Sequence, residues 1–150
     1  INELTEVILK TLRPIARKNN VEVTLISKRE ILAEVDKVKM SQIITNLVEN
    51  AIKYNREQGK VEVTLDADHQ FFTVQVEDTG IGIPAEAISQ IYERFYRVDK
   101  SHSRKIGGTG LGLAITRSAV LLHRGSIKVE SRENEGTTFT VKVPLTRSLT

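Results

Sequence analysis

Two hairpin patterns constrain the fold of this 150-residue chain more than any other feature. Apolar and polar residues alternate over 60–66 and 71–78 around a short turn, and again over 126–131 and 137–143. Such alternation is typical of strands that bury one face. Because helical patterns lie before and between the hairpins, we expect an α+β fold, a two-layer sandwich in which helices cover one mixed sheet.

Helical and strand patterns also fill the first part of the chain. Apolar residues at helical spacing predict a helix over 4–15, which Pro14 is expected to end or kink. Alternating β-branched residues predict a strand over 21–27 and a second, short strand over 31–35. These segments would add one helix and two strands to the sandwich.

Three further helices are predicted from apolar spacing, over about 37–54, 84–95 and 111–122. Asp36 is expected to cap the first of them, because its side chain can accept a hydrogen bond from an amide in the first turn. Gly125 follows the last helix and is expected to stop it. Helices and hairpins therefore come in mixed order, as a two-layer sandwich requires.

Composition places the chain among soluble globular domains and excludes several other classes. Hydrophobic residues make up 39% and charged residues 27% of the chain. No apolar run approaches the roughly 20 residues that span a bilayer, and no signal-peptide pattern is present. The absence of cysteine excludes disulfides, and a net charge of +3 is too small to favour a nucleic-acid partner. Because the first residue is Ile rather than Met, we expect a piece of a longer protein.

Four glycines fall within six positions of the stretch KIGGTGLGLAI, residues 105–115. The stretch lacks the Gly-Lys-Ser/Thr ending of a Walker loop, and it has neither the spacing nor the preceding strand of a dinucleotide fingerprint. It leads into the helix predicted over 111–122, whose first amides would favour an anion. A hinge without a ligand is the alternative.

Polar residues line one face of the predicted helix over 37–54. Asn46, Asn50 and Lys53 stand at i, i+4 and i+7, which places them one above another, with Glu49 beside them. Amide oxygens and a lysine suit a hydrated Mg²⁺ and phosphate oxygens. The alternative is a face that is simply solvated.

The motif EDTGIGIP, residues 77–84, places an acid at the end of a predicted strand. Asp78 is followed by Gly80 and Gly82. This pattern is compatible with a tight turn. It is also compatible with a carboxylate that accepts a hydrogen bond from the amino group of a base, beside backbone that a ligand can approach.

Taken together, four motifs resemble the N, G1, F and G2 boxes of the catalytic ATP-binding domain of bacterial sensor histidine kinases. They are NLVENAIKY (46–54), DTGIGIP (78–84), ERFYR (93–97) and GGTGLGLAI (107–115), in that order. The resemblance covers about residues 20–145. It implies the GHKL-type sandwich shared with DNA gyrase and MutL ATPases, in which ATP lies between the long helix and a mobile lid.

The resemblance also implies a role for each matching residue on the base and metal side of the site. Asp78 would hydrogen-bond the adenine amino group, and Gly80 and Gly82 would make room beside it. Asn50 would be the main Mg²⁺ ligand, with Asn46 in support. ATP and Mg²⁺ are therefore the implied cofactors.

On the other side of the implied site, Lys53 would meet phosphate and Tyr54 would pack on the adenine. Residues 97–106 would form the lid, from which Arg97 would reach the γ-phosphate. The glycine-rich stretch would complete the ATP-binding set with Gly108, Thr109, Gly110, Leu111 and Gly112. The expected catalytic residues are Asn46, Asn50, Lys53 and Arg97.

Position 46 favours phosphoryl transfer over hydrolysis. Hydrolases of the same superfamily carry at this place a Glu that activates water, whereas an Asn cannot act as a base. None of the chain's three histidines, His69, His102 and His123, has the acidic neighbour and helical context of the family's phosphoacceptor. The acceptor histidine is therefore expected on a separate dimerisation domain.

We accordingly expect residues 1–20 to be a linker and first helix that follow an absent dimerisation and phosphoacceptor domain. Residues 21–145 would form the catalytic domain and residues 146–150 a tail. The expected partners are ATP, the histidine-phosphotransfer domain of the same kinase and a response regulator, without nucleic acid or direct membrane contact. The fragment would be a cytoplasmic domain of a membrane-anchored sensor. A GHKL-type ATPase or serine kinase and a non-catalytic ATP-sensing module remain alternatives.

Overall fold

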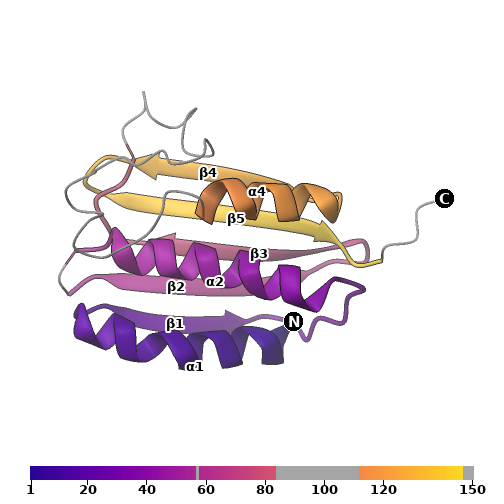
Figure 1. Ribbon diagram of the computed structural model, residues 1–150, viewed down its shortest axis with the longest axis horizontal. Helices are drawn as coiled ribbons and strands as arrows, with labels where there is room; N and C mark the ends of the chain where they lie inside the picture. The colour runs from indigo at the N-terminus through magenta and orange to yellow at the C-terminus, as the bar shows by residue number, and fades with distance from the viewer. Residues whose placement is uncertain (57, 84–111, 147–150) are drawn as a thin grey trace.

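A single mixed sheet carries all the helices of the described chain on one face (Figure 1). The computed structural model describes residues 1–56, 58–83 and 112–146. The sheet order is β1-β2-β3-β5-β4; β1 pairs with β2 in parallel, and the other pairs are antiparallel. The elements are α1 Asn2–Lys18, β1 Glu22–Ser27, α2 Lys37–Lys53, β2 Lys60–Ala67, β3 Phe71–Asp78, α4 Gly112–Leu122, β4 Ser126–Arg132 and β5 Gly136–Pro144. This arrangement confirms the predicted two-layer α+β sandwich.

The core lies between this sheet and the helices, where the period of each element turns its apolar residues inward. On β2, Val61, Val63 and Leu65 are fully buried and alternate with polar residues. Helix α2 lies over the middle of the sheet in Figure 1 and buries its apolar stripe there. Both predicted hairpins are confirmed, as are the strand over 21–27 and the helices over 37–54 and 111–122. The helix predicted over 84–95 lies outside the described residues.

The prediction of a strand over 31–35 was wrong. This segment is irregular, and its backbone groups pair with other parts of the molecule. The side-chain oxygen of Asn2 accepts from the Ile31 amide at 2.7 Å, and the Glu34 amide donates to the Leu145 carbonyl at 2.8 Å. Ile31 is only 2% exposed, so the apolar pattern reflects anchoring of this segment in the core rather than strand pairing.

Pro14 does not end α1, contrary to one of the two outcomes expected for it, because the helix continues to Lys18. A proline inside a helix removes the hydrogen bond to the carbonyl four residues earlier, here that of Lys10. Pro14 and Lys10 both lie on the exposed face of α1, where water can solvate that carbonyl. On the opposite face Leu12 and Ala16 are buried and hold the last turns against the core.

The start of α2 is fixed by two hydrogen bonds of Asp36. The Asp36 side chain caps the helix, as predicted, by accepting from the Lys39 amide at 3.0 Å. The Asp36 amide donates to Nε2 of His123 at 3.1 Å. Because Nε2 accepts, Nδ1 of His123 carries the proton and faces the Ala119 carbonyl at 2.9 Å. His123 therefore ties the beginning of α2 to the end of α4.

None of the helices within the described ranges is both long enough and apolar enough to cross a membrane.

Helix α1 packs into the core, so a cavity on its inner face should destabilise the chain. Leu9 is fully buried, whereas Val7 on the same helix is 63% exposed. Leu9→Ala is expected to lower the free energy of unfolding by about 2–5 kcal/mol. The matched control Val7→Ala should change it by no more than about 0.5 kcal/mol. Urea denaturation of the two variants and the parent measures both effects, and equal values for the two variants would contradict this placement of α1.

Candidate functional site

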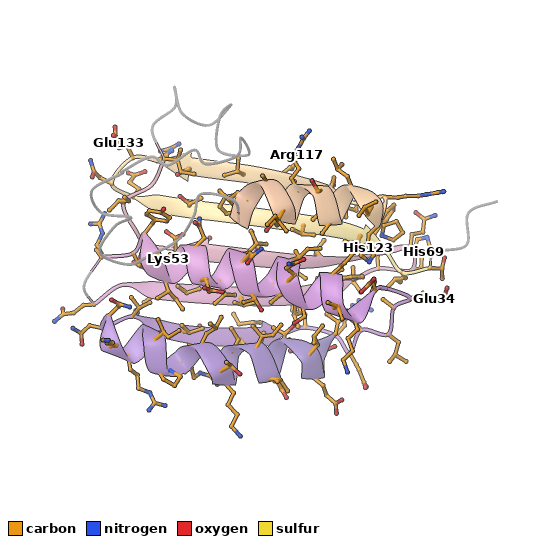
Figure 2. All side chains as sticks on the ribbon, in the orientation of Figure 1. Glu34, Lys53, His69, Arg117, His123 and Glu133 are labelled. Atoms are coloured by element: carbon orange, nitrogen blue, oxygen red, sulfur yellow. The ribbon has the colours of Figure 1, made fainter. Side chains whose placement is uncertain are left out.

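Several of the predicted site residues that the structure describes lie near one end of the sandwich, because Lys53 ends α2 and Asp78 ends β3. Figure 1 shows the end of α2, the end of β3 and the turn between β4 and β5 at the same end of the molecule. Lys53 marks this end in Figure 2, and His69 and His123 mark the opposite one. The candidate site is therefore assembled from segments that are far apart in the sequence.

The polar face of α2 carries Asn46, Asn50 and Lys53, all half-buried. The side-chain amide of Asn46 donates to the hydroxyl of Thr116 on α4 at 3.3 Å. Thr116 is fully buried, so this contact lies between the two helices. Asn46 thus faces α4, while Asn50 and Lys53 follow along the same face toward the end of the helix.

Asp78 ends β3 in a protected position, with an exposed fraction of 9%. The Gly80 amide donates to Oδ1 of Asp78 at 2.9 Å. Burial raises the pKa of Asp78 from its usual 3.8 to about 6, although hydrogen bonds from the Gly80 and Thr137 amides act in the opposite direction. At neutral pH the side chain is therefore mainly a carboxylate, a hydrogen-bond acceptor for the amino group of a ligand.

Gly80 and Gly82 let the segment after β3 lie directly against other backbone. A Cβ on Gly80 would collide with the carbonyl oxygen of Tyr54, and one on Gly82, at φ +72°, would collide with that of Arg132. The Ile81 amide also donates to the Tyr54 carbonyl at 3.0 Å. Both glycines are thus required by close packing within the protein. Their predicted role beside an adenine remains a prediction.

Sequence reasoning missed two residues that shape this end of the molecule, Asn55 and Arg56. The Asn55 side chain donates to the Lys60 carbonyl at 2.9 Å. Nη2 of Arg56 donates to the carbonyls of Gly80 at 3.0 Å and Asn134 at 2.6 Å. Their place directly after the motif that ends at Tyr54 was the only signal, because their partners are backbone groups that no side-chain pattern reveals.

Several predicted contacts lie outside the residues that the structure describes, namely Arg97, Gly108, Thr109, Gly110 and Leu111. Gly112, the last member of the predicted glycine-rich set, opens α4. The lid and most of the glycine-rich contacts therefore stay predictions.

The side chains on the polar face of α2 can be compared with the ligands that the predicted Mg²⁺ would need. Within the described ranges, no cluster of three or more His, Cys, Asp or Glu side chains could hold a metal ion. The amide oxygens of Asn46 and Asn50 suit Mg²⁺, which keeps several waters and takes substrate phosphates as ligands. These residues therefore fit a metal that enters with a phosphate ligand rather than one held in an all-protein cage.

Comparison with known proteins identifies families and proteins that are similar to this chain. Residues 35–147 match the family described as histidine kinase-, DNA gyrase B-, and HSP90-like ATPase. The sensor histidine kinase WalK of Bacillus subtilis (strain 168) is 42% identical over 118 residues, which are 77% of this chain and 19% of WalK. The chain spans about a fifth of the length of such curated relatives.

Solved structures agree with the sequence comparison. The catalytic domain of histidine kinase ThkA superimposes with a TM-score of 0.85 at 32% identity, over 98% of this chain and 93% of that domain. Histidine kinase ThkA in complex with response regulator protein TrrA gives a TM-score of 0.80 at 30% identity, over 98% of this chain and 41% of ThkA. The sandwich described above is thus that of histidine kinase catalytic domains.

The buried Asp78 carboxylate should give the unfolding free energy a characteristic pH dependence. Because the folded-state pKa of about 6 lies above the usual 3.8, the folded chain binds this proton more tightly, and stability falls as the pH rises from about 4 to about 6. The Asp78→Asn variant has no carboxyl group at this position and should not lose stability in this way. Its free energy of unfolding, relative to that of the parent, should therefore rise by about 3 kcal/mol between pH 4 and pH 7. Urea denaturation at several pH values measures the change.

The control for this prediction is Asp66→Asn, which removes a carboxylate whose side chain is 43% exposed. Its stability profile should run parallel to that of the parent over the same pH range. A parallel profile for Asp78→Asn as well would contradict the environment assigned to Asp78.

Proposed function

From the premise that the chain is a catalytic ATP-binding domain of the histidine kinase-, DNA gyrase B-, and HSP90-like ATPase family, we propose the following reaction. The domain binds ATP with Mg²⁺ at the end of α2 and transfers the γ-phosphoryl group to a histidine of a separate dimerisation domain. The observation that carries the proposal is the buried Asp78 carboxylate beside the end of α2, whose polar face bears Asn50 and Lys53.

The adenine is the part of the nucleotide that Asp78 would recognise. Its carboxylate, charged at neutral pH, accepts a hydrogen bond from the exocyclic amino group, and a guanine has a carbonyl oxygen at that place instead. Tyr54 is half-buried at the end of α2, where its ring would pack on the base. The base would thus be held between the end of β3 and the end of α2.

The phosphates would lie along the polar face of α2. Asn50 would hold the metal through its amide oxygen, and Lys53 would neutralise phosphate charge. When bound, Mg²⁺ supplies charge stabilisation to the transferring phosphoryl group. The predicted contacts of Arg97 and of residues 108–112 would complete the phosphate side.

The contact of Asn46 supports transfer rather than hydrolysis. Its amide donates to Thr116, and an Asn has no basic group that could deprotonate water. Phosphoryl transfer needs mainly positioning and charge stabilisation, which an amide and a lysine can supply. We therefore propose Asn46 as a support for α2 and Asn50 rather than as a base.

The two described histidines support an acceptor outside this domain. Figure 2 shows His69 and His123 at the end of the molecule opposite Lys53. Both ring nitrogens of His123 are engaged, with the Asp36 amide and the Ala119 carbonyl. His102 lies outside the described residues.

For the whole protein we propose the organisation of a two-component sensor. Residues 1–20 would follow the dimerisation domain, residues 21–145 would form the catalytic domain, and residues 146–150 a tail. Its partners would be the histidine-phosphotransfer domain of the same kinase and a response regulator, as the complex of ThkA with TrrA suggests. The domain would work in the cytoplasm as part of a membrane-anchored sensor.

Incubation with γ-labelled ATP, Mg²⁺ and the separate histidine-bearing domain tests the proposal. The label is expected on the histidine domain, with little free phosphate. Asn50→Ala should reduce transfer by about 100-fold or more, because charge on the phosphoryl group loses its stabilisation. Gln42→Ala, at an exposed position of the same helix, is the matched control and should retain transfer.

Other results of this incubation would favour the alternatives. Free phosphate without labelled histidine would indicate a GHKL-type ATPase. Binding of ATP with neither product would indicate a sensing module.

A further inference from the structure

Arg56 connects two loops that meet beside the end of α2. One terminal nitrogen of its guanidinium, Nη2, donates to the carbonyl of Gly80 at 3.0 Å and to the carbonyl of Asn134 at 2.6 Å. Gly80 belongs to the segment after β3, and Asn134 to the turn between β4 and β5. Each terminal nitrogen of the guanidinium carries two N–H groups, so Nη2 can donate to both carbonyls.

The same two loops are also joined by the backbone of Ile81. The Ile81 amide donates to the Tyr54 carbonyl at 3.0 Å, and the Asn134 amide donates to the Ile81 carbonyl at 2.6 Å. The end of α2, the segment after β3 and the β4–β5 turn thus form a closed set of contacts. The Arg56 side chain, just after the end of α2, adds hydrogen bonds to both of these loops.

Among the residues that the structure describes, the partners of the Arg56 guanidinium are carbonyl oxygens rather than an acid. The ion pairs found within the described ranges join Arg29 to Asp66 and Arg132 to Glu135, and neither involves Arg56. Hydrogen bonds from a charged donor are stronger than those between neutral groups. A guanidinium that bonds only backbone carbonyls within this part of the chain fixes the position of the loops.

The contacts of Gly80 connect Arg56 to the carboxylate of Asp78. The Gly80 carbonyl accepts from Arg56, and the Gly80 amide donates to Oδ1 of Asp78. A shift of Gly80 away from α2 would therefore move the donor that orients this carboxylate. The side chain of Arg56 itself is exposed, so a purely packing role does not account for its contacts.

We infer that Arg56 is a positioning residue for nucleotide binding. It holds the segment of Gly80 and Ile81 in place so that Asp78 meets the amino group of the base. This inference rests on the proposed function. Arg56 would therefore affect how tightly the site binds ATP and how strongly it prefers adenine. The rate of phosphoryl transfer would depend on the residues of α2 instead.

The test compares the parent chain with Arg56→Met, which keeps a long side chain but removes the donors. The dissociation constant for ATP is expected to rise about tenfold, because a tenfold change corresponds to the free energy of about one charged hydrogen bond. The preference for ATP over GTP should fall to a similar extent, because guanine has a carbonyl oxygen where adenine has the amino group that donates to Asp78. The rate of transfer at saturating ATP should stay within about twofold, since the α2 residues are unchanged.

Two further variants complete the comparison. Arg29→Met removes one positive charge from an arginine that pairs with Asp66, and it should leave ATP affinity and base preference unchanged. Arg56→Lys keeps the charge without the planar guanidinium and should give an intermediate affinity. It also serves as the test variant if Arg56→Met does not fold.

Amide exchange in the nucleotide-free chain separates this inference from the proposed function. The Ile81 amide should exchange faster in Arg56→Met than in the parent, whatever ligand the site binds. Unchanged ATP affinity and unchanged Ile81 exchange in the variant would overturn the role of Arg56. A parent chain that does not bind ATP, with faster Ile81 exchange in the variant, would instead overturn the proposed function and leave only a structural role for Arg56.

Discussion

The burial of one face of α2 against the sheet fixes where every polar residue of that helix points. Ile43, Leu47 and Val48 are fully buried, and Ala51 is nearly so. A helix with one face held in the core cannot rotate about its axis without exposing that face to water, which opposes rotation by roughly 1.5–3 kcal/mol per large side chain. Its other face is thereby directed to α4 and to the end of β3.

This constraint explains how ordinary core packing positions the residues of the proposed site. The residues at 46, 50 and 53 share a face because of helical geometry, and the contact of Asn46 with Thr116 shows which neighbour that face meets. The antiparallel pairing of β3 with both β2 and β5 then brings Asp78 to the same end of the sandwich. The nucleotide site we propose thus follows from the positions of α2 and β3.

Asp78 shows that this end of the molecule is not optimised for stability alone. A carboxylate is buried there although burial raises its pKa to about 6, and charging it at neutral pH costs folding free energy. Gly136, at φ +128°, allows the start of β5 to approach the Asp78 carbonyl closely. A buried acid with a raised pKa is a candidate for ligand binding, and the proposed function assigns that role to Asp78.

Much of the fold could be predicted from the sequence because local patterns determine it. The two hairpins follow from apolar alternation, and the cap at Asp36 from the chemistry of helix starts. The irregular segment at 31–35 was misassigned because a run of apolar residues does not reveal whether a neighbouring strand is available to pair with it. Arg56 was missed for a related reason, since its partners are carbonyls 24 and 78 residues away along the chain.

Backbone amide spectra of the chain, recorded while ATP and Mg²⁺ are added, test most directly whether the nucleotide occupies the end of α2 and β3. We predict that the signals of Asn50, Lys53, Gly80 and Ile81 shift with a common dissociation constant, while those of His69 and His123 at the opposite end do not shift. Saturable shifts confined to the opposite end, or no shifts at millimolar ATP, would contradict it.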